Sequence, residues 1–77
     1  MAKSENQKMK TLFVAKYFLE NSDENHPITA GDITDYLKNE CGIESERRAI
    51  YRDIAALRDV FGMDIAGGQG GKYRLLS

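Results

Sequence analysis

Residues 45–61 carry the pattern that most constrains the fold, because they read as a single amphipathic helix. Their apolar residues recur at i, i+4, i+7 and i+11, the spacing of one helical face. These residues are Ile50, Ile54, Leu57 and Phe61. Ser45 is the expected N-cap, since its hydroxyl accepts from a free N–H of the first turn. Gly62 follows where a left-handed residue ends many helices.

The opposite side of this predicted helix is basic and aromatic over its first two turns. The residues concerned are Arg47, Arg48, Tyr51 and Arg52. A helix with one buried seam and such a free face suits the DNA major groove, which is about 12 Å wide. The alternative is a solvated face with i,i+4 ion pairs, a spacing that Glu44 and Arg48 have.

A first helix is expected over residues 7–21, where Leu12, Ala15 and Leu19 follow one stripe. Val14 and Phe18 widen that stripe, so the helix is expected to pack on more than one neighbour. Residues 1–6 are polar, and we expect them to be frayed.

A second helix over residues 30–40 has a nearly complete start signal. Thr29 is the expected N-cap, with Asp32 in the reciprocal position of a capping box. Ile28 and Ile33 have the spacing of a hydrophobic staple. Gly42 ends this helix, and the short gap before the next one is typical of a helix-turn-helix.

After Gly62 the hydrophobic period changes from helical to alternating, with a glycine-rich stretch at 67–71. Residues 63–76 are therefore predicted to form a β-hairpin. A phosphate-binding loop is the poorer interpretation, because the Gly-Lys-Ser/Thr ending is missing and no helix follows. The predicted fold is mainly α with a small β-hairpin (α+β), in one domain that spans residues 1–77.

The chain has 77 residues, 42% of them hydrophobic. No apolar run approaches the roughly 18 residues of a membrane span, and no secretory signal is visible, so no membrane association is expected. A single cysteine, Cys41, argues against a disulfide-stapled secreted domain and for a cytoplasmic location. Cys41 and His26 alone do not make a structural zinc site. With no catalytic constellation either, we expect neither a cofactor nor an enzyme.

The net charge is −1, which is unusual for a nucleic-acid-binding chain. Its distribution is uneven, since residues 20–40 hold six acids against one lysine, and residues 1–19 are basic. Positive charge also lies on residues 47–58 and near the C-terminus. This asymmetry permits binding to a polyanion.

Two parts of the chain resemble a known family. The segment Cys41–Leu57, and above all its Ile-Tyr-Arg-Asp-Ile run, resembles the recognition-helix region of WYL-type bacterial transcription regulators. Residues 62–65 and 71–75 resemble the wing of the same DeoR-related domain. The likeness covers residues 9–76, with Ala49 where the family usually has Thr. Its members continue into a ligand-sensing domain, so this chain is expected to be an excised or stand-alone module.

The resemblance implies a three-helix winged helix-turn-helix that binds double-stranded DNA as part of a transcription regulator. The residues expected to contact DNA are Ser45, Arg47, Arg48, Tyr51, Arg52 and Lys72. Arg47 and Arg48 are expected to reach base edges, and Tyr51 and Arg52 the backbone or a thymine methyl. A homodimer is expected through a domain absent from this chain. The alternatives are a winged-helix module that binds protein and not DNA, and a weaker RNA-binding hypothesis.

The other notable side chains receive structural roles. Asp53 is expected to hold an arginine, with Arg74 the candidate, or to cap a backbone donor. Tyr73 is assigned to the core, and Arg58 is treated as a bystander.

Overall fold

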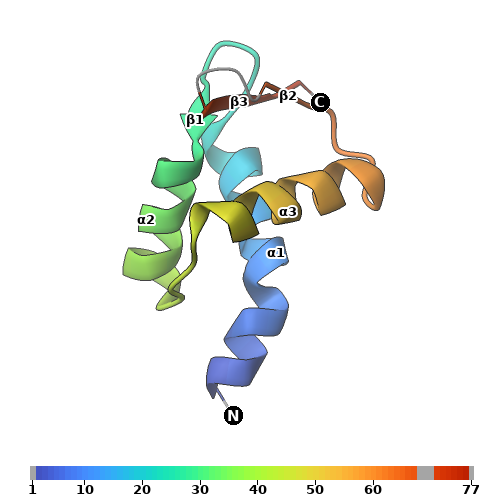
Figure 1. Ribbon diagram of the computed structural model, residues 1–77. Helices are drawn as coiled ribbons and strands as arrows, with labels where there is room; N and C mark the ends of the chain where they lie inside the picture. The colour runs from blue at the N-terminus through green and yellow to red at the C-terminus, as the bar shows by residue number, and fades with distance from the viewer. Residues whose placement is uncertain (1, 68–70, 77) are drawn as a thin grey trace.

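The structure, a computed structural model, describes residues 2–67 and 71–76 (Figure 1). It is mainly helical, with a small antiparallel sheet, which confirms the predicted α+β class. The elements in chain order are α1 (Ala2–Asn21), β1 (Ile28–Thr29), α2 (Ala30–Cys41), α3 (Arg47–Asp59), β2 (Ile65–Gly67) and β3 (Lys72–Leu75). The sheet lies next to the end of α1 and the start of α2, and α3 runs lengthwise beneath it (Figure 1).

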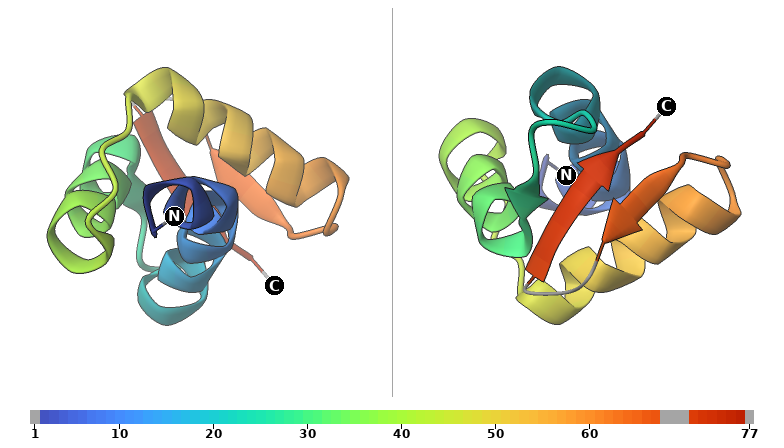
Figure 2. Two further views of the ribbon diagram at one scale, coloured as in Figure 1. Left: turned by 90° about the horizontal axis from the view of Figure 1, so that it is seen from below. Right: turned by 90° about the horizontal axis from the view of Figure 1, so that it is seen from above.

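The sheet has the order β1-β3-β2, so β3 lies in the middle (Figure 2, right). β2 and β3 form the predicted antiparallel hairpin, with Ile65 opposite Leu75. β1 was not predicted from the sequence, because it has two residues and runs directly into α2. It pairs with β3 through Ile28 and Tyr73 and so joins the hairpin to the helices.

The core lies between the three helices and the inner face of the sheet. Apolar residues recur on the inward side of every element, and their side chains are almost completely buried. They are Val14, Phe18, Ile28, Ala30, Ile33, Leu37, Ile43, Ile50, Ile54, Leu57, Ile65, Tyr73 and Leu75. Tyr73 therefore belongs to the core, as the sequence predicted.

α1 differs from the prediction in its start and in its buried face. It begins at Ala2, so residues 2–6 are helical and the expectation of a frayed start was wrong for them. Val14 and Phe18 are fully buried, whereas Leu12 and Leu19 are 52% and 69% exposed. Apolar residues surround much of this helix, so only contact with α2 and α3 decides which of them face inward.

α2 follows its sequence closely. The Thr29 hydroxyl accepts from the Asp32 backbone N–H, and the Asp32 carboxylate accepts from the Thr29 N–H, both at 3.0 Å. This is the predicted capping box. Gly42 adopts the left-handed conformation at the other end, with φ of 68°, and its N–H donates to the Leu37 carbonyl.

α3 keeps its predicted seam but not its predicted ends. Ser45 is not the N-cap: Glu46 occupies that position and makes no side-chain capping bond. The Ser45 hydroxyl instead lies 3.4 Å from the Glu46 carbonyl. Phe61 is exposed, because the helix ends at Asp59 and the chain turns at Gly62, whose φ is 71°.

The glycine-rich stretch lies only partly within the described residues, and 68–70 fall outside them. Gly67, at the end of β2, has a φ of 127°, and a Cβ there would lie 2.2 Å from the Lys72 carbonyl oxygen. Only glycine fits such a close approach between the two strands.

Within residues 2–67 and 71–76, none of the helices has the length and apolar composition of a membrane span.

Candidate nucleic-acid interface

The outward side of α3 is defined by the seam that anchors its inward side. Ile50, Ile54 and Leu57 are at most 1% exposed and point into the core. With about 100° between successive residues, Arg48, Arg52 and Asp59 lie within about 30° of the opposite direction. Ala55 lies beside them. We call Arg48, Arg52, Ala55 and Asp59 the outer strip of α3; all four side chains are exposed.

Arg47 and Tyr51 lie on one flank of α3 and not on the outer strip. A Cβ on Gly31 of α2 would lie 3.7 Å from a terminal guanidinium nitrogen of Arg47, so this arginine reaches over the first turn of α2. The Tyr51 ring lies 6.3 Å from that of Tyr73 on β3. The two side chains border a groove of about 250 Å³. Its lining is Thr29, Ala30, Gly31, Arg47, Tyr51 and Gly71.

The predicted DNA-contacting residues therefore fall into separate groups. Arg47, Arg48 and Arg52 are all exposed, but Arg47 diverges from Arg48 by about 100° around the helix axis. Ser45, in the turn before α3, is half-buried. Lys72 is exposed at the start of β3, where it alternates with the buried Tyr73.

Asp53 anchors the other flank of α3 to α1. Its carboxylate forms an ion pair with the Lys10 ammonium and accepts from the Thr11 hydroxyl at 2.9 Å. The Lys10 and Asp53 side chains are only 12% and 13% exposed. The structural role predicted for Asp53 is confirmed, but the predicted partner, Arg74, was wrong. The sequence offered no signal for this pair, because its members lie 43 positions apart.

Arg58, for which the sequence predicts no role, links α3 to the sheet. Its Nε donates to the Ile65 carbonyl at 2.7 Å, and its guanidinium lies 6.0 Å from the centre of the Tyr73 ring. Burial is the main factor that raises the pKa of Tyr73, and Tyr51 adds to it. Arg58 is thus engaged in structure, unlike the arginines of the outer strip.

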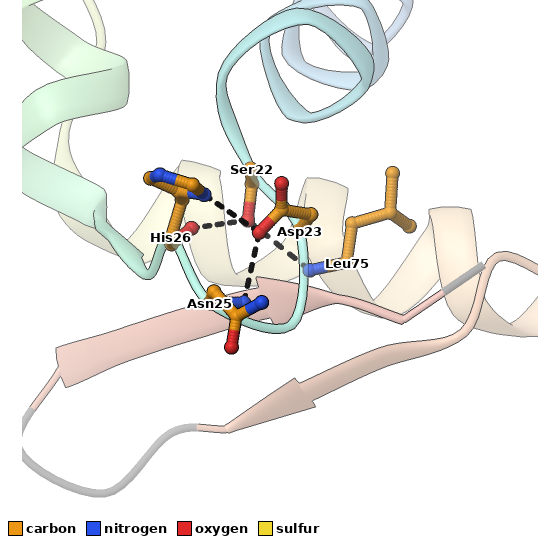
Figure 3. Close-up of polar contacts among 5 residues, drawn as sticks. All are labelled: Ser22, Asp23, Asn25, His26 and Leu75. Atoms are coloured by element: carbon orange, nitrogen blue, oxygen red, sulfur yellow. Dashed lines mark hydrogen bonds and ion pairs between the residues drawn. The ribbon is translucent and has the colours of Figure 1, made fainter.

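Ser22 is a second anchor that the sequence did not reveal (Figure 3). Its buried hydroxyl donates to the His26 carbonyl at 2.9 Å and accepts from the Leu75 N–H at 3.1 Å. The loop after α1 thereby holds the middle strand of the sheet.

In the same loop, a hydrogen bond from His26 and another from the Asn25 N–H lower the pKa of Asp23.

The described residues contain no cluster of three or more His, Cys, Asp or Glu side chains that could hold a metal ion. No known protein family, curated protein or solved structure matches this chain. The basis for a functional assignment is therefore the sequence together with the geometry of α3, α2 and the sheet.

Proposed function

We propose that this chain is a winged helix-turn-helix domain that binds double-stranded DNA, as the DNA-binding part of a WYL-type bacterial transcription regulator. The observation that carries the proposal is the outer strip of α3, where the Arg48 and Arg52 side chains are exposed on the side of the helix opposite a fully buried seam. Among the side chains of residues 9–67 and 71–76, no ion pair engages Arg47, Arg48 or Arg52. Their charges are therefore available to phosphates and base edges.

The arrangement around α3 supports the same proposal. α2 precedes α3 across a short turn, 42–46, as in helix-turn-helix domains whose second helix enters the major groove. The β2–β3 hairpin would be the wing, and Gly71 at its edge borders the groove beside Arg47. Lys72 would then contact the DNA backbone from the wing while α3 occupies the groove.

A net charge of −1 does not oppose this assignment, because local charge governs a contact that extends over a few phosphates. The exposed acids at positions 23, 24, 32, 35 and 40 belong to α2 and the loop before it. Such a regulator would act in the cytoplasm. Two copies on paired half-sites would add affinity that one domain lacks.

Fluorescence anisotropy with a labelled duplex tests the proposal directly. If three to five phosphates are neutralised, log affinity should fall with log salt at a slope of about −3 to −4 between about 50 and 200 mM salt. The double substitution Arg48→Ala with Arg52→Ala should weaken binding at least tenfold and flatten that slope. Lys16→Ala, which removes one exposed charge from α1, is the control and should change affinity far less.

The alternative is a protein-interaction module without DNA binding. The exposed Met9, Leu12 and Leu19 of α1 favour it, since exposed apolar side chains on one helix are common at interfaces. This alternative expects no measurable duplex affinity at low salt, the result that would overturn our proposal. Tighter binding to single-stranded or duplex RNA than to DNA would favour the RNA-binding hypothesis.

A further inference from the structure

The side chains of α3 divide into those suited to read bases and those suited only to hold the DNA backbone. This division rests on the proposed function, because the same surface would supply the sequence preference. A helix that enters the major groove presents its outermost side chains to base edges, and its flanks face the two phosphate strands. The direction of each side chain around the helix therefore decides its role.

Arg48 and Arg52 lie on opposite sides of the outward direction of α3, about 27° and 13° from it respectively, and one helical turn apart. Both are exposed, and neither is engaged by another described side chain in an ion pair. Arginine at the floor of a major groove donates two parallel hydrogen bonds to guanine O6 and N7. In zinc-finger helices, side chains three positions apart contact successive bases, so a spacing of four residues fits neighbouring base pairs.

Arg47 is unsuited to the groove floor, although it precedes Arg48 directly. It points about 130° away from the outward direction, and its guanidinium lies against Gly31 of α2. Tyr51 points about 90° away on the same flank, toward Tyr73 of the sheet. From there the two side chains face a phosphate strand that would run between α2 and the hairpin.

We propose that Arg48 and Arg52 are the base-reading residues, that the preferred duplex carries guanine in two neighbouring base pairs, and that Arg47 and Tyr51 contact the backbone alone. This assignment replaces the pairing of Arg47 with Arg48 expected from chain position. Both arginines lie in the first two turns of α3 and the exposed Asp59 lies in its last turn, so the first two turns are the part of the outer strip proposed to enter the groove.

Selection from duplexes with a randomised central region, followed by sequencing of the bound fraction, tests this assignment. The unmodified chain should enrich two adjacent base pairs that each contain guanine. Arg48→Ala should relax the preference at one of these pairs, and Arg52→Ala at its neighbour. Each loss of discrimination should be about 5- to 150-fold, as for one bidentate arginine–guanine contact.

Arg47→Ala is the matched control, because it removes the same side chain from the adjacent position. It should weaken binding to all duplexes by a similar factor and leave the enriched sequence unchanged. If Arg47→Ala relaxes a base preference, or if Arg48→Ala and Arg52→Ala leave the enriched sequence intact, the assignment is wrong while DNA binding stands. If the unmodified chain binds no duplex at all, the proposed function fails, and this inference fails with it.

Discussion

α2 and α3 meet at one turn, yet different kinds of interaction hold them in place. α2 carries a complete capping box at its start and a left-handed glycine at its end, and all of these contacts are local. α3 begins without a side-chain cap. It is held instead by its buried seam, by the ion pair of its Asp53 with Lys10 of α1, and by the hydrogen bond of its Arg58 to the Ile65 carbonyl of β2.

This difference shows how a helix can be firmly positioned and still offer a free face. The contacts that fix α3 all use its inward side or its flanks, so Arg48 and Arg52 have no structural role among the described contacts. Substitutions that weaken tertiary contacts of α3 should therefore cost the most stability, and those in the local cap of α2 less.

The largest effect is expected from Leu57→Ala, which removes a fully buried side chain from the seam of α3. The free energy of unfolding, measured by urea denaturation, should fall by about 2–5 kcal/mol, because the core loses apolar contacts and gains a cavity. Arg52→Ala on the outer strip is the control and should change it by less than about 0.5 kcal/mol. Equal losses for both variants would mean that the two sides of α3 do not differ in this way.

Asp53→Ala should have the next largest effect. It leaves the nearly buried Lys10 ammonium without its carboxylate and the Thr11 hydroxyl without its acceptor. We expect a loss of about 1–3 kcal/mol in the same measurement, since unpaired buried polar groups are costly. Asp59→Ala removes an exposed acid from the same helix and should have little effect. A loss for Asp59→Ala as large as for Asp53→Ala would contradict the anchoring role of Asp53.

Thr29→Ala tests the local interactions of α2. The substitution removes the oxygen that accepts from the Asp32 N–H, so the free energy of unfolding should fall by about 1 kcal/mol. Thr29→Ser keeps an acceptor in the same position and serves as the control. If Thr29→Ala were as stable as Thr29→Ser, the capping box would contribute nothing to α2.

The smallest effect is expected from Ser45→Ala, because Ser45 does not cap α3. The free energy of unfolding should change by less than about 0.5 kcal/mol. A loss equal to that of Thr29→Ala would show that Ser45 caps α3 in solution, and the contrast between the two helix starts would disappear. Duplex affinity of the same variant tests the separate prediction that Ser45 contacts DNA.

Much of the fold was predictable because its signals are local. The Thr29–Asp32 box, the left-handed Gly42 and Gly62, the seam of α3 and the alternation around Tyr73 all depend on residues a few positions apart. Helical period and cap chemistry operate at that range, so one sequence suffices to recognise them. The same reasoning failed for α1, where apolar residues occur on several sides and no period singles out Val14 and Phe18.

The sequence by itself determined three helices, a hairpin and a basic side on α3. Only the tertiary structure decided what each basic residue contacts. Arg48 and Arg52 lie exposed on the outer strip, and Arg47 reaches over α2. Arg58 donates to the Ile65 carbonyl of β2, and Lys10 pairs with Asp53. The same holds for Ser22, which joins the loop after α1 to Leu75. The physical reason is distance along the chain, since an ion pair or hydrogen bond between residues tens of positions apart leaves no periodic trace in the sequence.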